Sequence, residues 1–184
     1  MTGAASAGLF GKLPARGDFV RAGLPGDFVA AWDDWLQDVL AASRAQLGTA
    51  WLPAFLKAPA WRFLLPPGRC GAGGVLGVLL PSVDRVGRYF PLTLAAVMPP
   101  HEAAPDDAAW LDTAVAAGLA ALERDAAPEE VMHLLPAPPI GAAGAPGFWT
   151  LDADGAVARR LVPAGLPDAA MFAAMLESSE TIPC

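Results

Sequence analysis

Residues 75–98 read VLGVLLPSVDRVGRYFPLTLAAVM, and this stretch decides the fold. Two apolar runs, residues 75–80 and 92–98, flank a short polar segment. Each run has the length and the β-branched content of a buried strand. The apolar residues are almost continuous instead of alternating, which is typical of strands that are covered on both faces. The stretch therefore predicts two central strands in a layered domain.

The polar segment between these runs allows two interpretations. Pro81 ends the first run because it cannot donate to a strand ladder, and Ser82 and Asp84 can bond nearby backbone groups. In the first interpretation the loop satisfies its own charges, since Arg85 and Arg88 can each pair with Asp84. In the second, one arginine faces outward and binds a carboxylate or phosphate of a partner through its planar guanidinium.

A second charged loop follows the short apolar run of residues 8–13 near the start of the sequence. Pro14 and Gly17 punctuate this loop, and they bracket Arg16 and Asp18. The simplest interpretation is a local ion pair between Arg16 and Asp18 that pins the loop, which contributes little to stability if it is exposed.

Apolar periodicity predicts the remaining elements. Two long amphipathic helices are expected over residues 25–47 and 106–124, with Trp32 and Trp35 as core anchors in the first. Gly118 lies within the apolar stripe of the second helix, which indicates close packing on another element. Shorter helices are expected over residues 51–57, 128–135 and 166–176, and further strands over 8–13, 61–65, 148–151 and 157–162.

The order of these elements predicts the fold class. Helices fall between groups of strands, which favours a mixed, largely antiparallel sheet with helices on both faces. The expected fold is α/β, a three-layer α-β-α sandwich. The 184 residues form one domain, 1–184, large enough to bury roughly 70% of the unfolded surface without a disulfide or metal. Residues 1–7 and the loop 136–147 are expected to be flexible.

Composition excludes several classes of protein. The formal net charge is −7, which argues against a general nucleic-acid binder or a binder of anionic membranes. No apolar run approaches the roughly 20 residues of a membrane span, and no signal peptide precedes the domain. Cys70 and Cys184 are in no metal-ligand spacing and are expected to be free thiols. We therefore expect a cytoplasmic protein without nucleic-acid partners or membrane insertion.

No catalytic motif is present in the sequence. It lacks GxSxG, GxGxxG and GxxxxGK[ST], and neither His101 nor His133 has a second metal-type ligand at helical spacing. A triad of Ser82, His101 and Asp84 can be drawn, but nothing in the spacing demands it. We expect no enzymatic activity, no cofactor and no metal.

Several short motifs follow one another in the first half of the chain. They are GKLP (11–14) with GDF (17–19), WDDWL (32–36), PAWRF (59–63), and PSVDRVGR (81–88) followed by YFPL (89–92). In this order they resemble the TagF/ImpM family of type VI secretion-associated proteins. The resemblance covers residues 9–98, and beyond them it is limited to helix placement and the strand that contains Trp149.

The resemblance implies an α/β sandwich and a cytoplasmic accessory protein of Gram-negative bacteria. It implies a post-translational repressor of type VI secretion whose partner is the forkhead-associated scaffold protein of the apparatus. In the family, repression works alongside a threonine kinase and phosphatase pathway, and some members are fused to the phosphatase. The present sequence shows no phosphatase segment, so we expect any such partner to be a separate protein. No enzymatic activity is established for the family.

The motif residues of the family carry over to seven charged or polar positions in two loops. The resemblance does not separate residues that bind a partner from residues that hold the loops together. We expect the loops 11–19 and 81–88 to lie side by side at one end of the sheet, because both are charged and enter core elements. The seven residues are Lys12, Arg16, Asp18, Ser82, Asp84, Arg85 and Arg88.

Two other functions remain open from the sequence. One is an enzyme that acts on a phosphorylated substrate through Asp84 with Arg85 or Arg88. The other is a structural subunit of the secretion apparatus. The leading function is a regulatory binding module.

Overall fold

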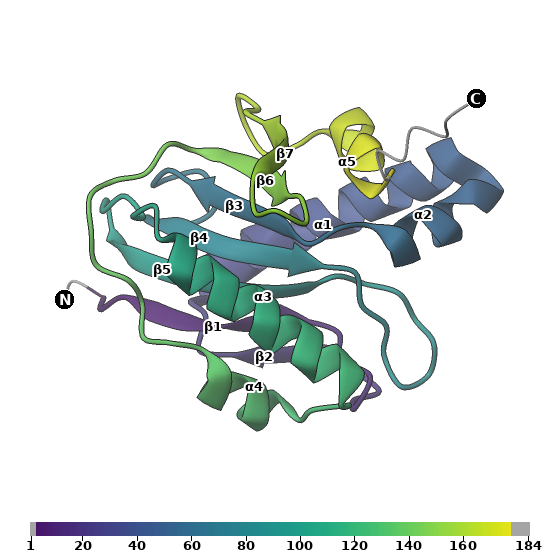
Figure 1. The fold of residues 1–184 in the computed structure, drawn as a ribbon, viewed down its shortest axis with the longest axis horizontal. Coiled ribbons are helices and arrows are strands. Elements are labelled where there is room, and N and C mark those ends of the chain that lie inside the picture. The colour runs from purple at the N-terminus through teal and green to yellow at the C-terminus, as the bar shows by residue number, and fades with distance from the viewer. Residues whose placement is uncertain (1–2, 178–184) are drawn as a thin grey trace.

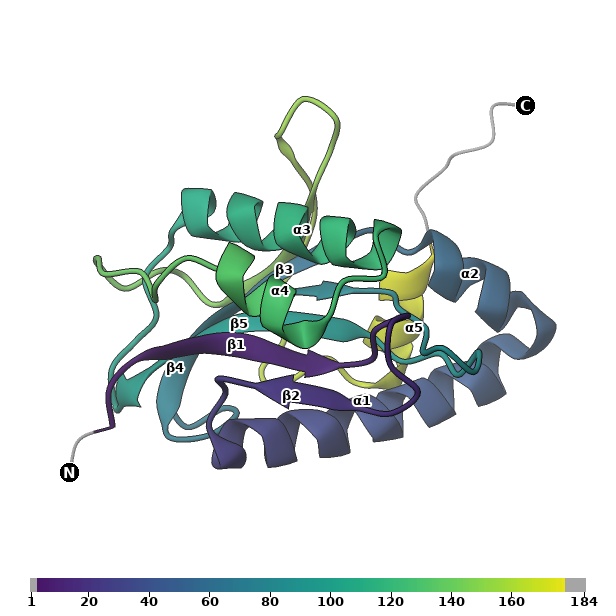
Figure 2. The same cartoon turned by 90° about the horizontal axis from the view of Figure 1, so that it is seen from below.

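A computed structural model describes residues 3–177 of the chain. It contains one seven-stranded sheet between two layers of helices, as Figures 1 and 2 show. The strand order is β2-β1-β5-β4-β3-β6-β7, and each neighbouring pair is antiparallel. The three-layer sandwich is confirmed. Over the described residues the sheet is fully antiparallel rather than mixed. Four of its pairs, β1·β2, β3·β4, β4·β5 and β6·β7, join strands that follow one another, which short connections allow only in antiparallel pairs.

Every predicted helix and strand is present. The strands are β1 (Ser6–Gly11), β2 (Val20–Ala22), β3 (Trp61–Leu65), β4 (Gly73–Leu80), β5 (Leu92–Pro100), β6 (Gly147–Leu151) and β7 (Val157–Leu161). The helices are α1 (Gly26–Leu47), α2 (Trp51–Lys57), α3 (Ala108–Glu123), α4 (Pro128–Leu134) and α5 (Ala169–Leu176), with a 3₁₀ turn, η1 (Gly48–Ala50), before α2.

Two features of the first strands differ from the prediction. Strand β2 was not predicted, because a three-residue strand is too short to show a period, and its place is set by pairing with β1. Strand β1 begins earlier than expected, at Ser6. Ser6 and Ala7 fall within residues 1–7, which were expected to be flexible, and they pair with Val97 and Ala96 of β5.

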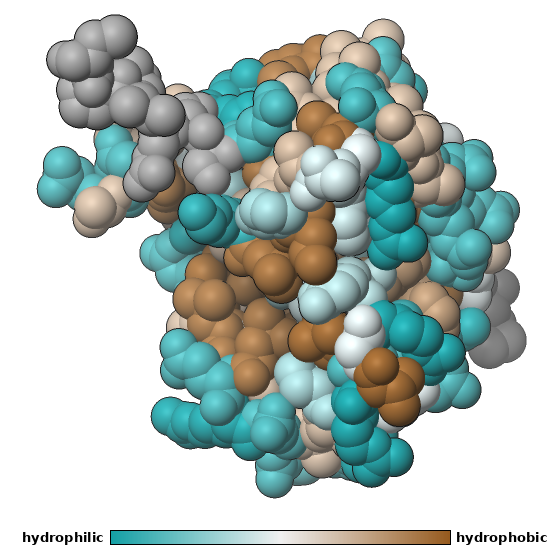
Figure 3. All heavy atoms as spheres, turned by 90° about the vertical axis from the view of Figure 1, so that its right-hand side faces the viewer, coloured by the Kyte–Doolittle hydropathy of each residue, from teal (hydrophilic) through white to brown (hydrophobic). Residues whose placement is uncertain are grey.

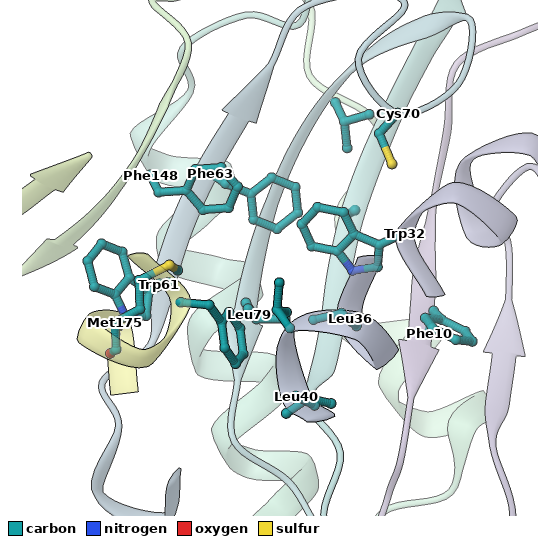
Figure 4. Close-up of a cluster of buried hydrophobic side chains, with 14 of the residues drawn as sticks. Phe10, Trp32, Leu36, Leu40, Trp61, Phe63, Cys70, Leu79, Phe148 and Met175 are labelled. Carbon is teal, nitrogen blue, oxygen red and sulfur yellow. Dashed lines mark hydrogen bonds between the residues drawn. The ribbon is translucent and has the colours of Figure 1, made fainter. Parts of the chain in front are cut away.

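One face of the sheet carries an aromatic core under α1, α2 and α5. Trp32 stacks on Phe28 and Phe63, and its indole N–H donates to Thr93 Oγ1 at 2.8 Å. Figure 4 shows side chains of α1 pointing at those of β3 and β4. Trp32 is thus the predicted core anchor. Trp35 is only partly buried, and its indole N–H donates to the Pro167 carbonyl at 2.8 Å.

The other face packs against α3 and α4. Gly118 is a point of close approach, because a Cβ added there would lie 2.8 Å from Leu80 Cδ1. The predicted close packing at this glycine is confirmed. Figure 1 shows α3 lying across the front of the sheet.

The segment that follows α4 is partly tied down. The Gly144 N–H donates to the Ala104 carbonyl at 3.0 Å, and Pro105 and Ala143 form an isolated bridge. Ile140, between these ties and α4, is fully exposed. The expected flexibility of residues 136–147 stays a prediction.

Two sequence-based expectations concern cysteines and membranes. Cys70 is a buried free thiol, and Cys184 lies outside the described residues. Between residues 3 and 177, no helix combines the length and the apolar character needed to cross a bilayer.

Candidate functional site

The two charged loops meet at one end of the sheet. Gly11 of β1 and Leu80 of β4 both pair with Leu92 of β5, so the chain leaves β1 and β4 at the same edge. The loop after β1 therefore lies beside the loop 81–91, at the right-hand end of Figure 1. The predicted side-by-side arrangement is present in the structure.

Asp84 is the centre of this arrangement. Its Oδ2 accepts hydrogen bonds from Lys12 Nζ at 2.5 Å and from Arg88 Nε at 2.7 Å. Its Oδ1 accepts from the backbone N–H groups of Val86 at 3.0 Å and of Arg88 at 2.9 Å. Both the Lys12 and Asp84 side chains are almost completely shielded from solvent.

These donors set the charge state of Asp84. Burial alone would raise the pKa of its carboxyl group, but the hydrogen bonds from Lys12 and from the backbone and side chain of Arg88 hold that pKa well below its usual range. Asp84 is therefore an ionised carboxylate at neutral pH. Four donors already occupy its two oxygens.

Three further hydrogen bonds join the loops directly. Ser82 Oγ donates to the Lys12 carbonyl at 2.7 Å, and the Arg85 N–H donates to the Arg16 carbonyl at 2.9 Å. The guanidinium of Arg88 donates to the Gly17 carbonyl. The two loops consequently form one unit, although 72 positions separate Lys12 from Asp84.

Burial divides the seven candidate residues into two groups. Lys12, Ser82 and Asp84 are buried and hold the loops together. The remaining four, which are exposed and open to a partner, are Arg16, Asp18, Arg85 and Arg88.

Two predicted ion pairs are not formed. Arg16 does not pair with Asp18, because the Asp18 carboxylate turns back to accept from the Phe19 N–H at 2.8 Å. Arg16 Nη2 instead lies 3.7 Å from Glu129 of α4. Arg85 does not pair with Asp84, whose oxygens are already occupied. Its side chain reaches over Gly17, where an added Cβ would lie 3.6 Å from Arg85 Nη2.

Phe19 is a residue of the site that the sequence reasoning missed. Its ring stacks on Phe10 and meets Phe90 edge-on, with centroids 5.9 and 4.8 Å apart. Lys12 Nζ lies 4.6 Å from the centre of the same ring. Phe19 thus covers the buried ion pair while 44% of it stays exposed. The available signal was a large aromatic residue directly after the charges of a loop.

The triad drawn from the sequence is not assembled. His101 follows β5 at the opposite end of the sheet from Ser82, because Gly73 rather than Leu80 pairs with Pro100. The Ser82 hydroxyl donates to the Lys12 carbonyl instead. Over the residues that the structure describes, no three His, Cys, Asp or Glu side chains gather as potential metal ligands.

Most of the chain matches a known protein family. The family model described as the TagF N-terminal domain, type VI secretion system-associated, matches residues 8–137. This chain belongs to the TagF family. The match includes both charged loops, and it makes the chain a type VI secretion-associated protein.

A solved structure extends the similarity beyond the matched residues. The chain is 34% identical to the protein in the crystal structure of PA0076 from Pseudomonas aeruginosa PAO1, with 98% of each chain covered and a TM-score of 0.77. The comparison with curated proteins found no match. The similarity to this structure therefore extends over β6, β7 and α5, which follow the region matched by the family model.

Proposed function

We propose that this TagF-family protein represses type VI secretion after translation by binding a forkhead-associated scaffold protein of the apparatus. The binding surface is formed by the exposed arginines of the two joined loops. The observation that carries the proposal is the division of roles in the site. Asp84 is buried and bonded within the loops, while Arg16, Arg85 and Arg88 are exposed to solvent.

Local charge supports a protein partner with an acidic surface. The two loops, residues 11–19 and 81–91, contain four basic and two acidic residues, 4 − 2 = +2, in a chain whose net charge is −7. Lys12 and Asp84 cancel each other in the interior. A cationic area on an acidic protein favours a partner of opposite local charge and suppresses wrong partners.

Apolar groups accompany these charges. Val86 is 66% exposed in the loop 81–91, and Phe19 is also exposed and lines a groove with residues of α1. Arginine and aromatic side chains are enriched at the centres of protein interfaces, where they supply most of the binding energy. The mixture supports recognition of a protein rather than of a small anion.

The proposal assigns no catalysis to the loops. A carboxylate that serves as a base or nucleophile needs an oxygen that can reach the substrate. Asp84 is buried, and hydrogen bonds within the protein occupy both of its oxygens. We propose a cytoplasmic, non-enzymatic regulator that is linked to the threonine kinase and phosphatase pathway through its partner.

Arg85→Glu tests this proposal most cleanly. Unlike Arg88, Arg85 contributes only its backbone N–H to the joined loops, so the substitution leaves the interior of the loops unchanged. The control is Arg69→Glu, which makes the same charge change on an exposed residue at the other end of the sheet. Binding of each purified variant to the purified scaffold protein is measured by calorimetry, and circular dichroism confirms folding.

Each result has a distinct meaning. We expect Arg69→Glu to bind like the wild type and Arg85→Glu to bind at least tenfold more weakly. Equal binding of all three proteins would move the surface away from the loops. Absence of binding by the wild type would remove the scaffold as the partner.

A further inference from the structure

A small apolar slot opens next to the charged loops. Its walls come from the end of α2, from α5, from the last residues of β4 and from the residue just before β5, and they include Phe55, Pro59, Pro81, Pro91, Met175 and Leu176. Figure 3 looks at this end of the molecule and shows apolar side chains gathered in its middle, with hydrophilic residues around them.

The size of the slot limits what it can hold. The volume of the slot that the centres of water molecules can reach is about 20 Å³. One water molecule needs roughly 10–15 Å³ of such volume, so the slot has room for about one or two water molecules. This is the space of one side-chain tip, whereas pockets for small molecules and cofactors are far larger. The slot therefore suits a single apolar side chain from a protein partner.

The slot is continuous with the charged loops. Pro81 and Pro91 form part of its wall and are also the first and last residues of the loop 81–91. The slot therefore adjoins the base of the loop that carries Arg85 and Arg88. Leu52 and Leu56, in the same helix as the wall residue Phe55, are exposed apolar side chains.

Charges around the slot indicate the chemistry of that segment. Lys57 is exposed at the end of α2, directly before the residues that form the mouth. The wall residues Pro81 and Pro91 begin and end the loop that carries Arg85 and Arg88, and Glu177 after α5 is an exposed acidic residue next to the wall residue Leu176. A partner segment with acidic residues beside its apolar anchor complements this arrangement.

We infer that the slot anchors one hydrophobic side chain of an acidic segment of the partner, while flanking carboxylates of that segment meet Arg85 and Arg88. This inference rests on the proposed function and names the chemistry of the partner at the same surface. An anchor of this kind acts as a hot spot, because surrounding contacts exclude water from a filled apolar pocket.

Two substitutions of Ala58 test the slot. Ala58 lies in the wall and is partly buried, so a larger side chain at this position occupies the slot. Ala58→Trp fills the mouth, and Ala58→Glu adds a charge that repels an acidic segment. The control is Ile140→Glu, which introduces the same charge at a fully exposed apolar residue outside this surface. Affinity for the purified scaffold protein is measured by calorimetry, alongside Arg85→Glu.

We expect both Ala58 variants to bind at least tenfold more weakly and Ile140→Glu to bind within twofold of the wild type. Normal binding by the Ala58 variants, with weak binding by Arg85→Glu, would show that the slot does not anchor the partner and would leave the proposed function intact. Absence of binding by the wild type would overturn both.

Two further measurements complete the test. If an Ala58 variant shows a lower urea midpoint, Leu56→Glu replaces it, because the Leu56 side chain is already 54% exposed and its substitution leaves the core intact. Sedimentation of the wild type and Ala58→Glu over a range of concentrations tests whether a second copy of the chain occupies the slot. Self-association that is lost in the variant would overturn the assignment to an acidic partner.

Discussion

Lys12 Nζ and Asp84 Oδ2 lie 2.5 Å apart in the interior of the joined loops, although the residues belong to different loops. The pair connects the end of β1 to the connection between β4 and β5. Arg88 and Ser82 of the loop 81–91 also donate hydrogen bonds to backbone carbonyls of the loop after β1. The exposed arginines consequently project from a rigid base, which reduces the entropy lost when a partner binds.

Lys12→Met removes the charge that faces Asp84. We expect the free energy of unfolding to fall by about 3 kcal/mol, at the low end of the usual cost of breaking a buried ion pair, because Arg88 and two N–H groups remain on the carboxylate. Urea unfolding measures the change. The double variant Lys12→Met/Asp84→Asn is expected to recover part of the loss. Strictly additive losses would show that the two side chains are not coupled.

The depressed pKa of Asp84 makes stability depend on pH. Because the folded protein holds the carboxylate ionised, its contribution is fully present above the unfolded pKa of about 3.9. The contribution is lost as the pH falls below that value toward the folded pKa. We expect the stability difference between the wild type and Asp84→Asn to be constant from pH 7 to pH 5 and to shrink at pH 3. Urea midpoints at these three pH values provide the measurement, and an unchanged difference at pH 3 would contradict the assignment.

Gly118 lets α3 approach the sheet. Gly118→Val places side-chain atoms against Leu80, and we expect a loss of about 1–3 kcal/mol from overpacking. Ala116→Val on the exposed face of α3 is the control, with an expected change below about 0.5 kcal/mol. Thermal unfolding of both variants measures the effect. Equal melting temperatures would mean that α3 does not pack at this distance.

Cys70 is expected to resist thiol reagents in the folded protein. Burial, with a smaller effect of Asp27, raises the pKa of its thiol to about 12, and the thiolate is the reactive form. In a Cys184→Ser variant, which leaves Cys70 as the single thiol, we expect a chromogenic disulfide to react at least a hundredfold faster in denaturing urea than in buffer at pH 8. Comparable rates in the two conditions would show that Cys70 is accessible in the folded state.

The elements of the fold were predictable because their signals are local. Trp32 and Leu36 follow helical spacing, and the two runs around the loop 81–91 show the apolar continuity of covered strands. Strand β2 has no such signal, since Val20–Ala22 is too short to show a period. Its position depends on β1, and only the paired sheet reveals it.

The amino-acid sequence by itself determined the family, the layered fold and the seven polar positions of the two loops, because motifs and periodicity are properties of neighbouring residues. Only the tertiary structure decided which charges meet. The pairing of β1 and β4 with β5 brings Lys12 to Asp84 and leaves Arg85 exposed. A pairing across 72 positions depends on strand order and register, and those are set by the packing of the whole sheet between its helices.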